Sequence, residues 1–438
     1  MLNEMIKHAL QGQLGPSYRD FYGALKKSRQ VFIFECKRRS PSEGILCHHY
    51  PVIQMAKTYE PFADVISVLT NQRYFDGCLT HLKQVSDNVK VPVLCKDIIV
   101  SPYQVILARH YGADAILLML SVLDDETYRE CHALAEELKM GVLTEVITEN
   151  ELLRAAQLKA KAIAINHRDL QTFQIDKDRV INLSSHFPKE TIIIAASGIS
   201  THQEIVRLTP YVNGFLIGSS LSKSKSIELT LRELVYGPVK VCGLTRAQDS
   251  INAYEQGAIY GGLIFAPNSK RCIALSRAQE ITASVPLRYV GVFSQQPIDL
   301  VQYYATVLEL CAVQLHGNET PEYIATLREG LPSTCQIWLA INGQMPLPTS
   351  LPEQVDKLVL DNIQDNQGGT GFTFDWQSVH HYGIRQHCFL AGGISPNNVL
   401  SAKQMGLFGL DVNSGVEQAP GIKNLALLKQ LFHRLRGN

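Results

Sequence analysis

The chain has 438 residues, too many for one ordinary domain but suited to two α/β barrels of roughly 200–250 residues each. Lysine plus arginine and aspartate plus glutamate both number 41, so the net charge is zero and nothing favours a nucleic-acid or membrane-surface partner. The chain shows no signal peptide, no apolar run of about 18 residues and no C-x-x-C pair, so we expect a cytoplasmic, reduced, globular protein without metal.

Short apolar runs alternate with helical patterns through the first half of the chain. The opening run places Glu35 and Lys37 two residues apart, and period-two alternation puts both side chains on one face of a strand. A surface ion pair would contribute little to stability, so this pair indicates a site at the strand end. The eight predicted strands are 31–37, 64–70, 91–97, 115–120, 141–146, 162–166, 191–197 and 214–219.

These runs are continuously apolar, as in parallel strands that are buried on both faces. Helices fit the gaps between them. Ser101-Pro102 predicts the start of one helix and Gly112 its end. The segment 124–141 predicts another, with acidic residues in its first turn and Lys139 and Gly141 at its end. Eight strands that alternate with helices are typical of a closed (β/α)8 barrel.

The second half of the chain repeats the pattern. Segment 226–237 predicts the last helix of the first barrel, and Gly237-Pro238 marks the join. Eight further strands are predicted at 239–245, 260–265, 288–293, 312–317, 336–341, 357–361, 388–393 and 409–414. We therefore predict two tandem (β/α)8 TIM barrels, over residues 1–237 and 238–438. The alternative, one doubly wound sheet of about sixteen strands, exceeds normal sheet sizes.

Polar residues gather at the carboxyl ends of the predicted strands, where barrels carry their catalytic groups. In the first barrel these residues are Glu35, Lys37, Thr70, Lys96, Ser121, Glu145, Asn166, Ser197 and Ser219. In the second they are Cys242, His316, Asp361 and Asp411, with Arg271 in a following loop. A single strand-end charge is often merely solvated, but two Lys and two Glu on one rim indicate a site. A Cys–Asp pair can act as base and acid, although Cys242 could also be an inert buried thiol.

The loops after the last two strands of each barrel have the composition of phosphate sites. They read "SGIS" and "GSSLS" in the first barrel, and "AGGIS" and "DVNSGVE" in the second. The glycine-rich "NQGGTGF" (366–372) indicates either a mobile loop over the second mouth or a plain surface linker. His48-His49 and His380-His381 lack metal-ligand spacing, and we expect them at the surface.

Two sets of motifs resemble known enzyme families. "FECKRRSPSEG", "SVLTNQRYFDG", "VLCKDIIVSPYQ", "GVLTEV" and "NGFLIGSSL" closely resemble indole-3-glycerol-phosphate synthase. "KVCGLTRAQD", "VQLHGNE", "LVLDN", "LAGGIS" and "GLDVNSGVEQAPGIK" resemble phosphoribosylanthranilate isomerase. The order is that of the fused bifunctional enzyme of tryptophan biosynthesis in enteric-type bacteria, and the resemblance covers almost the whole chain.

The resemblance implies two consecutive reactions that need no metal or redox cofactor. The C-terminal barrel would convert N-(5'-phosphoribosyl)anthranilate by an Amadori rearrangement. The N-terminal barrel would then close the indole ring with loss of CO2 and water. The implied ligands are anionic phosphosugar-anthranilates, with no nucleic acid and no membrane as partner, and we expect a monomer.

In the isomerase half, the resemblance implies that Cys242 is the general base and Asp361 the general acid. Arg271, His316 and Asp411 would contact the substrate. A thiol with an ordinary pKa of about 8.5 must be partly ionised to act as a base, and helix N-termini near the rim can favour the thiolate.

In the synthase half, Lys96 would be the general acid of ring closure and Glu145 the base of dehydration. Lys37 would meet the anthranilate carboxylate, and Glu35 would orient Lys37. Asn166 and Arg168 are the remaining substrate-binding candidates. The implied phosphate-binding residues of the two halves are Ser40, Gly198, Gly218, Ser219, Gly392, Gly393, Ser414 and Gly415.

The chain also departs from the family patterns. Ala196 stands where the synthase usually has Glu before "SGI", Asn71 where an acid normally follows "LT", and Ile98 where Phe is common. In the isomerase half, Leu339 replaces a usual Lys and Asn424 a usual Asp. The segment before the first strand is short, so we expect the extra N-terminal helix that covers the synthase site to be truncated.

Two alternatives to a working bifunctional enzyme stay open at this point. One is an active isomerase with an impaired or inactive synthase barrel. The other is a non-catalytic phosphosugar-binding or interaction protein. The Cys242–Asp361 and Lys96–Glu145 pairs argue against the second alternative, because binding alone does not require a matched acid and base.

Overall fold

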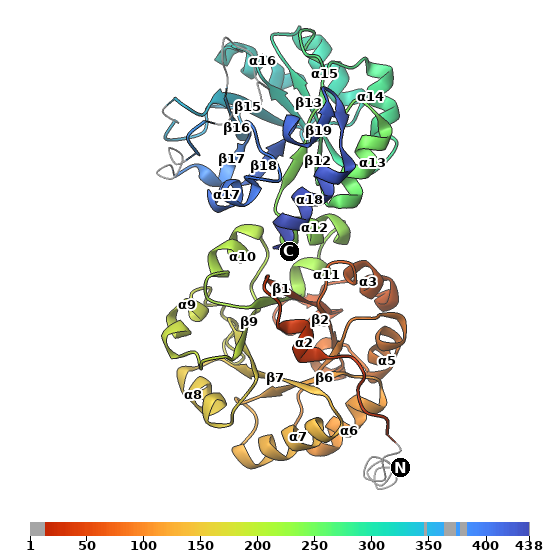
Figure 1. Ribbon diagram of the computed structural model, residues 1–438, viewed down its shortest axis with the longest axis vertical. Helices are drawn as coiled ribbons and strands as arrows, with labels where there is room; N and C mark the ends of the chain where they lie inside the picture. The colour runs from red at the N-terminus through yellow and green to blue at the C-terminus, as the bar shows by residue number, and fades with distance from the viewer. Residues whose placement is uncertain (1–13, 346–347, 363–373, 377–382, 438) are drawn as a thin grey trace. The chain divides into compact units, whose positions relative to one another are not determined.

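The computed structural model describes residues 14–345, 348–362, 374–376 and 383–437. The chain divides after Leu234 into two compact units, and each unit contains one closed barrel of parallel strands (Figure 1). The predicted fold class, two tandem (β/α)8 barrels, is therefore confirmed.

The barrel of the N-terminal unit closes through the order β1-β10-β9-β8-β7-β6-β5-β4. Its strands are β1 (Val31–Cys36), β4 (Val65–Leu69), β5 (Val93–Lys96), β6 (Ala115–Met119), β7 (Gly141–Val146), β8 (Ala162–Asn166), β9 (Ile192–Ala196) and β10 (Gly214–Ile217). β1 pairs in parallel with both β10 and β4, which closes the ring. A small hairpin, β2 (Arg39–Ser40) with β3 (Gly44–Ile45), follows β1.

Helices connect successive strands, as the alternating pattern predicts. They are α3 (Val52–Tyr59), α4 (Gln72–Phe75), α5 (Leu79–Asn88), α6 (Pro102–His110), α7 (Asp125–Glu137), α8 (Glu149–Gln157), α9 (Arg179–Leu183), α10 (His202–Leu208), α11 (Ser219–Ser222) and α12 (Ile227–Tyr236), with the 3-10 turn η1 (Ser184–His186). The Asp124 side chain accepts the Thr127 N–H and begins α7, while Thr148 forms a capping box that begins α8.

The predicted end of α7 is wrong, for an identifiable reason. The helix ends at Glu137, Lys139 takes a left-handed φ of 54°, and Gly141 is already the first residue of β7. A Cβ at Gly141 would overlap the ring of Phe21, which lies in α2 (Phe21–Leu25). Glycine at this position therefore lets the Phe21 ring lie against the backbone at the base of the barrel, and it does not end a helix.

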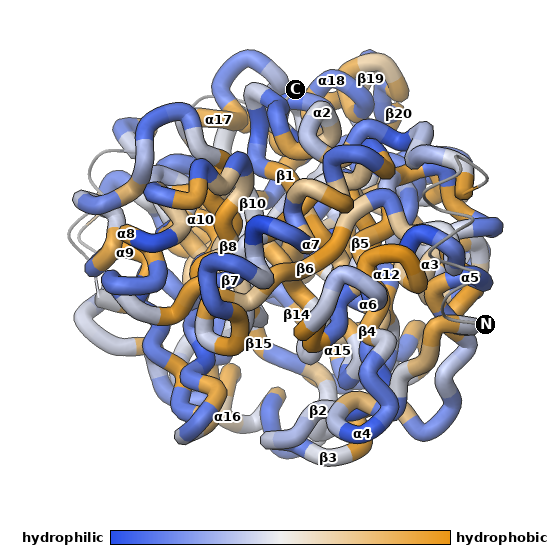
Figure 2. The backbone as a smooth tube through the Cα atoms, turned by 90° about the horizontal axis from the view of Figure 1, so that it is seen from below, coloured by the Kyte–Doolittle hydropathy of each residue, from blue (hydrophilic) through white to orange (hydrophobic). Residues whose placement is uncertain are grey.

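Inward-facing apolar side chains fill the lower part of the N-terminal barrel. Val31, Leu94, Leu143 and Leu216 belong to one buried cluster, which Phe21 of α2 joins. Strands such as β5 and β6 are drawn in hydrophobic colours, as Figure 2 shows. Because this layer is apolar, the polar side chains of the strands are confined to their carboxyl ends.

The C-terminal barrel closes through β11 to β18 in sequence order. Its strands are β11 (Val239–Val241), β12 (Tyr260–Ile264), β13 (Arg288–Phe293), β14 (Ala312–Leu315), β15 (Gln336–Asn342), β16 (Lys357–Asp361), β17 (Cys388–Leu390) and β18 (Gly409–Val412). β11 is shorter than predicted because Gly243, with a φ of 68°, turns the chain away. Cys242 therefore lies immediately after the strand.

The described helices of this unit are α13 (Ala247–Gln256), α14 (Leu275–Thr282), α15 (Ile298–Val307), α16 (Pro321–Gly330), α17 (Val399–Gln404) and α18 (Leu425–Arg436), with the 3-10 turns η3 (Arg385–His387) and η4 (Ser414–Val416). The hairpin of β19 (Glu417–Ala419) and β20 (Ile422–Lys423) follows β18. Inside the barrel, Trp338 stacks on Phe389 at a centroid distance of 4.6 Å, and Tyr260 meets Trp338 edge-on. These rings fill the interior beneath the mouth.

Candidate active sites

Three charged side chains meet at the carboxyl ends of β1 and β5. Glu35 of β1 is 3% exposed, and its Oε1 lies 2.9 Å from Lys37 Nζ. Its Oε2 lies 3.4 Å from Nζ of Lys96, the last residue of β5. The predicted pairing of Glu35 with Lys37 on one face is confirmed, and Lys96 shares the same carboxylate.

The two ammonium groups keep Glu35 ionised despite its burial. Burial raises the pKa of this carboxyl, but Lys37 and Lys96 outweigh that effect and lower the pKa to about 2. Burial lowers the pKa of Lys96, whereas the carboxylates of Glu35 and Glu145 raise it, and the net pKa of Lys96 lies above its ordinary value. Lys96 is therefore a charged proton donor at neutral pH.

Glu145 and Asn166 extend this cluster along the rim. Glu145 of β7 is buried, which raises the pKa of its carboxyl above the ordinary value, although Lys96 and a hydrogen bond with Asn166 oppose the rise. Asn166 ends β8, and its Oδ1 accepts the backbone N–H of Arg168 over 3.0 Å. A carboxyl with a raised pKa beside an ammonium group forms a pair that can exchange protons.

The remaining synthase-side candidates have different surroundings. The Ser40 hydroxyl is buried and has no hydrogen-bond partner among the described residues. Gly198 has a φ of 74°, and a Cβ at Gly218 would overlap the Glu35 carboxylate. Ser219 begins α11, directly after Gly218. Arg168 donates from Nη1 to the carbonyl of Phe173 in its own loop at 3.1 Å, and its position beside the cluster remains a prediction.

Two positions at which the chain departs from the synthase pattern have clear local roles. Asn71 caps α4 through its side chain and donates from Nδ2 to Asp97 Oδ1 at 3.1 Å. Thr70 donates from its hydroxyl to Asp97 Oδ2 at 2.6 Å, so a carboxylate lies beside this strand end. Ala196 is buried and belongs to the apolar cluster of the barrel interior.

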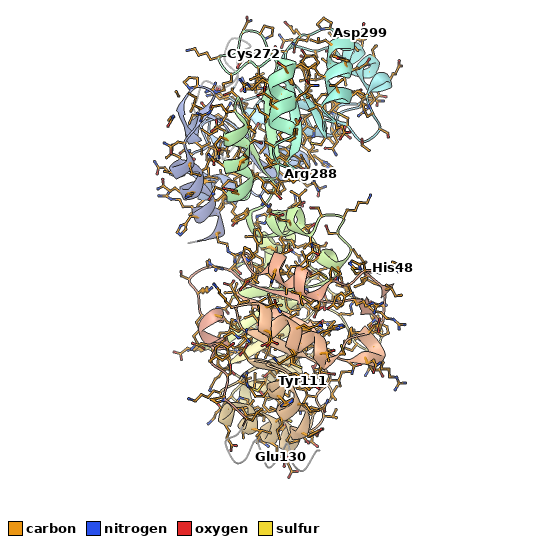
Figure 3. All side chains as sticks on the ribbon, turned by 90° about the vertical axis from the view of Figure 1, so that its right-hand side faces the viewer. His48, Tyr111, Glu130, Cys272, Arg288 and Asp299 are labelled. Atoms are coloured by element: carbon orange, nitrogen blue, oxygen red, sulfur yellow. The ribbon has the colours of Figure 1, made fainter. Side chains whose placement is uncertain are left out.

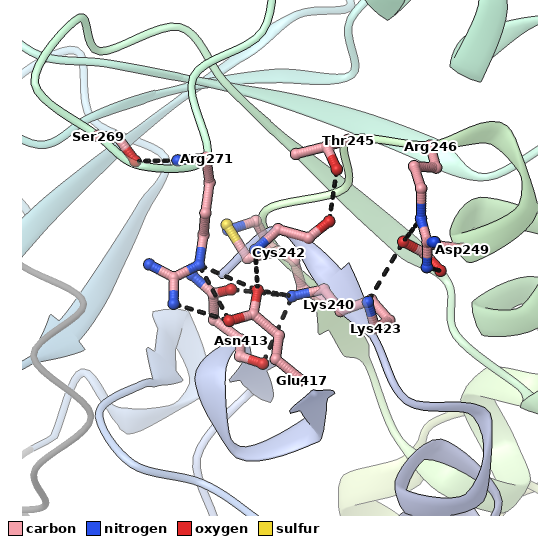
Figure 4. Close-up of polar contacts among 11 residues, drawn as sticks. Lys240, Cys242, Thr245, Arg246, Asp249, Ser269, Arg271, Asn413, Glu417 and Lys423 are labelled. Carbon is pink, nitrogen blue, oxygen red and sulfur yellow. Dashed lines mark hydrogen bonds and ion pairs between the residues drawn. The ribbon is translucent and has the colours of Figure 1, made fainter. Parts of the chain in front are cut away.

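In the C-terminal barrel a buried lysine lies beneath the predicted base (Figure 4). Lys240 of β11 is fully buried, and its Nζ donates to Cys242 Sγ at 3.2 Å. It also donates to Asp411 Oδ2 at 2.7 Å and to Gln314 Oε1 at 2.9 Å. These three acceptors match the three hydrogens of the ammonium group. Lys240 and Asp411 are register partners on neighbouring strands, which explains their contact.

Burial and neighbouring charges shift the pKa values of these groups in opposite directions. Burial raises the pKa of the Cys242 thiol, Lys240 opposes the rise, and the net pKa remains above the ordinary value. The pKa of Asp411 is raised in the same way, by burial against the effect of Lys240. Burial lowers the pKa of Lys240, but Asp411 and Cys242 raise it to about 12. Among the neighbouring charges that lower the pKa of the thiol, the Lys240 ammonium group has the largest effect.

The other predicted residues of this rim are His316 and Asp361. His316 Nε2 lies 3.8 Å from Asp361 Oδ2, and Gln314 donates from Nε2 to His316 Nδ1 at 3.3 Å. Burial lowers the pKa of His316, although Asp361 opposes this, so the ring favours its neutral form. Asp361 Oδ1 accepts the backbone N–H of Asn362 at 2.8 Å, so the other carboxylate oxygen, Oδ2, is the one that faces His316.

Arg271 is anchored by the hairpin that follows β18. Its Nε and Nη2 lie 2.9 and 2.7 Å from the two carboxylate oxygens of Glu417. Lys423 donates from Nζ to Glu417 Oε1 at 2.8 Å and to Asn413 Oδ1 at 2.9 Å. Burial raises the pKa of Glu417, but Arg271 and Lys423 lower it below the ordinary value. The guanidinium is therefore held in one orientation by a bidentate ion pair.

The two predicted phosphate loops of this barrel lie against each other. Gly392 and Gly393 have φ values of 80° and 64°, which only glycine adopts readily. A Cβ at Gly415 would overlap the carbonyl oxygen of Ile394. Ser414 begins the 3-10 turn η4 beside them. Their contact with a phosphate remains a prediction.

Comparison with known proteins decides the family. Residues 2–234 match the model of indole-3-glycerol phosphate synthase, and residues 239–434 match that of N-(5'phosphoribosyl)anthranilate isomerase. A tryptophan biosynthesis protein TrpCF of Vibrio cholerae is 48% identical over 96% of this chain and 89% of its own length. The TrpCF of Salmonella typhi is 46% identical over 98% and 94% of the two chains. The chain belongs to the TrpCF family.

Membership of the TrpCF family gives the chain both enzyme activities, indole-3-glycerol phosphate synthase and phosphoribosylanthranilate isomerase. These are consecutive steps of tryptophan biosynthesis, one in each barrel. The matches favour this interpretation over an inactive synthase barrel and over a non-catalytic protein. Among solved structures, the phosphoribosyl anthranilate isomerase of Thermus thermophilus is 32% identical and covers 46% of this chain and 98% of its own, with a TM-score of 0.41.

Four residues of this TrpCF family member were not predicted from the sequence. Lys240 and Gln314 each stand two residues before a predicted site residue, so period-two alternation could have placed them on the inward face. Glu417 and Lys423 gave no such signal, because only the folded hairpin brings them to Arg271.

The two histidine pairs and the glycine-rich segment were the weaker candidates. His48 and His49 are exposed, as predicted, and Figure 3 shows His48 at the surface of its unit. The glycine-rich 366–372, the pair His380-His381 and the N-terminal residues 1–13 lie outside the described residues. Within the described residues, no group of three or more His, Cys, Asp or Glu is arranged to hold a metal. None of the helices there is both long and apolar enough to cross a membrane.

Proposed function

We propose that the C-terminal barrel isomerises N-(5'-phosphoribosyl)anthranilate with Cys242 as general base and Asp361 as general acid. An Amadori rearrangement moves a proton between neighbouring sugar carbons while the sugar ring opens, so it needs a base at a carbon and an acid at the ring oxygen. Cys242 follows β11 and Asp361 ends β16, and β17 and β18 separate these strands on the shorter side of the ring. Acid and base therefore approach the sugar from different sides.

Three further residues of this barrel bind the substrate in our proposal. Arg271 is held by Glu417 in an orientation suited to an anionic group, and guanidinium groups recognise carboxylates well. His316 and Asp411 flank the acid and the base, respectively. The phosphate is bound by the two loops that end the barrel, through Gly392, Gly393, Ser414 and Gly415.

The N-terminal barrel then closes the indole ring, with Lys96 as general acid and Glu145 as general base. The observation that carries this assignment is the sharing of Glu35 between Lys37 and Lys96. The shared carboxylate orients Lys37 toward the anthranilate carboxylate and keeps Lys96 charged for protonation of the carbonyl. Asn166 and Arg168 contact the substrate from the end of β8 and the loop after it. The phosphate is bound by Ser40, Gly198, Gly218 and Ser219.

The enzyme needs no second chain in this proposal, because each cluster takes all its described residues from one barrel. We therefore propose a monomer, in the cytoplasm, whose ligands are anionic phosphosugar-anthranilates. We place the domain boundary between Gly237 and Pro238, where α12 has ended and Gly237 takes a φ of 82°.

Separate assays of two variants test the proposal. Lys96→Ala should abolish indole-ring closure and leave isomerisation near the wild-type rate. Cys242→Ala should do the reverse, with a loss of isomerase kcat of roughly 10²–10⁴-fold, the usual contribution of a general base. Thermal unfolding of both variants controls for misfolding. If either folded variant lost both activities, or kept the activity assigned to its barrel, the proposal would be wrong.

A further inference from the structure

The mechanism gives no role to the buried charge of Lys240 in the C-terminal barrel. Lys240 has no exposed surface, and a lysine is rarely fully buried unless its charge is compensated. Its ammonium group contacts one carboxylate, one amide and one thiol, and the thiol belongs to the proposed base. An inward-facing leucine or methionine would fill the same space without the cost of burying a charge. The position of this charge therefore calls for a functional explanation.

We propose that Lys240 is a positioning residue for the isomerase reaction, which favours the thiolate form of Cys242 and fixes its Sγ at the rim. This inference rests on the proposed role of Cys242 as general base. An ammonium group 3.2 Å from sulfur stabilises the negative form of the thiol strongly, since little water screens the pair. Without such a charge, burial would raise the pKa of the thiol further, and a smaller fraction of it could accept the substrate proton.

Space and geometry around the sulfur support this role. A Cβ at Gly262 on neighbouring β12 would come within 2.6 Å of Cys242 Sγ, so the absence of a side chain at Gly262 makes room for the sulfur. The Lys240 ammonium holds the sulfur from below, through a side chain on the same face of β11 two residues earlier. Both features position the thiol.

The same ammonium group links the base to the acid side of the rim. Lys240 donates to Gln314 Oε1, and Gln314 Nε2 donates to Nδ1 of His316. His316 Nε2 then faces Asp361 across 3.8 Å. Because Gln314 accepts from the lysine with its oxygen, its nitrogen must point to the imidazole, which assigns the hydrogen of the neutral ring to Nε2. Lys240 therefore also sets the tautomer that faces the proposed general acid.

Other charges act on Cys242 and determine how the proposal can be tested. Lys423 of β20 lowers the pKa of the thiol, as Lys240 does, whereas Asp411 of β18 raises it. Arg271, from the loop after β12, also faces the sulfur, and its pKa is raised in part by Cys242. Among the described residues, His316, Asp361 and Glu417 are further titratable groups of this rim. Lys240 and Asp411 thus have opposite effects on one thiol and can be varied separately.

The test is an ultraviolet titration of the Cys242 thiolate in the full-length chain. For each variant, the absorbance of the same protein with Cys242→Ser is subtracted, so that the other cysteines and the tyrosines cancel. We expect Lys240→Gln to raise the pKa of Cys242, Lys240→Arg to restore it in large part, and Asp411→Asn to lower it. Lys403→Gln is the matched control, because Lys403 is a half-buried lysine of this barrel that donates to the Leu435 carbonyl.

Isomerase kinetics supply the second readout. We expect Lys240→Gln to lower kcat/KM by roughly a hundredfold at neutral pH and to move the ascending limb of the rate profile, which reports deprotonation of the thiol, to higher pH. Shifts of the thiol pKa in the same direction in Lys240→Gln and Asp411→Asn would overturn the proposal, as would no shift in either. If Lys240→Gln does not fold, the Asp411→Asn titration decides alone. Full activity of Cys242→Ser would instead refute the role of Cys242 as base, while the titration would still test the electrostatic link.

Discussion

The Glu35 carboxylate between two ammonium groups allows a quantitative prediction. The ordinary pKa of a glutamate is 4.5, whereas the pKa of Glu35 is lowered to about 2. At about 1.4 kcal/mol per pKa unit, the difference corresponds to about 3 kcal/mol in favour of the ionised carboxylate in the folded barrel. Because Glu35 is almost fully buried, solvent screening does not reduce this value much.

The perturbation is Glu35→Gln, which keeps the shape of the side chain and removes its charge. Two half-buried ammonium groups, on Lys37 and Lys96, then lack their counter-charge. We expect a loss of about 3–5 kcal/mol in the stability of the N-terminal barrel, as for other broken buried ion pairs. We also expect a lower pKa for Lys96, because Glu35 is one of the two carboxylates that raise it.

The assay combines denaturant unfolding of the full chain with the pH profile of the synthase reaction. The alkaline limb of that profile, which reports Lys96 as acid, should move to lower pH in Glu35→Gln. The matched control is Asp87→Asn, which breaks an exposed ion pair with Lys83 and should cost less than about 1 kcal/mol. An unchanged alkaline limb together with unchanged stability would refute the reasoning.

The sign of the pH dependence follows from the same shift. Since the pKa of Glu35 is lower in the folded state than in the unfolded state, its stabilisation is fully present above about pH 4.5 and disappears as the pH falls toward about 2. The wild-type N-terminal barrel should lose stability over that window more steeply than the Glu35→Gln variant. Equal pH dependence of the two proteins would contradict the assignment.

Three further predictions concern other parts of the two sites. Ala196→Glu should destabilise the N-terminal barrel and should not increase synthase activity, because the new carboxylate enters an apolar cluster. A large gain in indole-3-glycerol phosphate formation would show that the natural site is impaired. Glu417→Gln should raise the isomerase KM severalfold and change kcat less, because it frees the Arg271 guanidinium; an unchanged KM would contradict the anchoring role. His316 has a lowered pKa in the folded barrel, so the stability of that barrel should fall as the pH drops below about 6.5, and less so in His316→Gln, as thermal unfolding can measure.

The sequence was sufficient for both barrels because buried parallel strands give a strong local signal. It misplaced the end of α7, since Gly141 serves a close contact with Phe21, and such a contact cannot be inferred from the helix itself. It also overestimated β11, because the chain turns at Gly243 with a φ of 68°, in a place where Arg271 and Asn413 leave no room for a Cβ. The errors in the predicted element boundaries therefore lie where distant parts of the chain meet.

The need for contacts between distant parts of the chain also explains which site residues could be predicted from the sequence. Glu35 and Lys37 are neighbours in sequence, so alternation alone pairs them. Lys240 and Asp411 are 171 positions apart, and only closure of the barrel between β11 and β18 makes them register partners. The alternation rule places Lys240 on the face of Cys242 but cannot tell that a carboxylate from the far end of the chain compensates its charge.

Two active sites that work independently on one chain should complement each other between variants. The most direct measurement is the overall conversion of phosphoribosylanthranilate to indole-3-glycerol phosphate by Lys96→Ala and Cys242→Ala, first alone and then mixed. We predict that neither variant alone completes the conversion, and that an equimolar mixture does, because the isomerase product of one protein reaches the synthase site of the other. Conversion by a single variant, or none by the mixture of two folded variants, would show that the two sites are not independent.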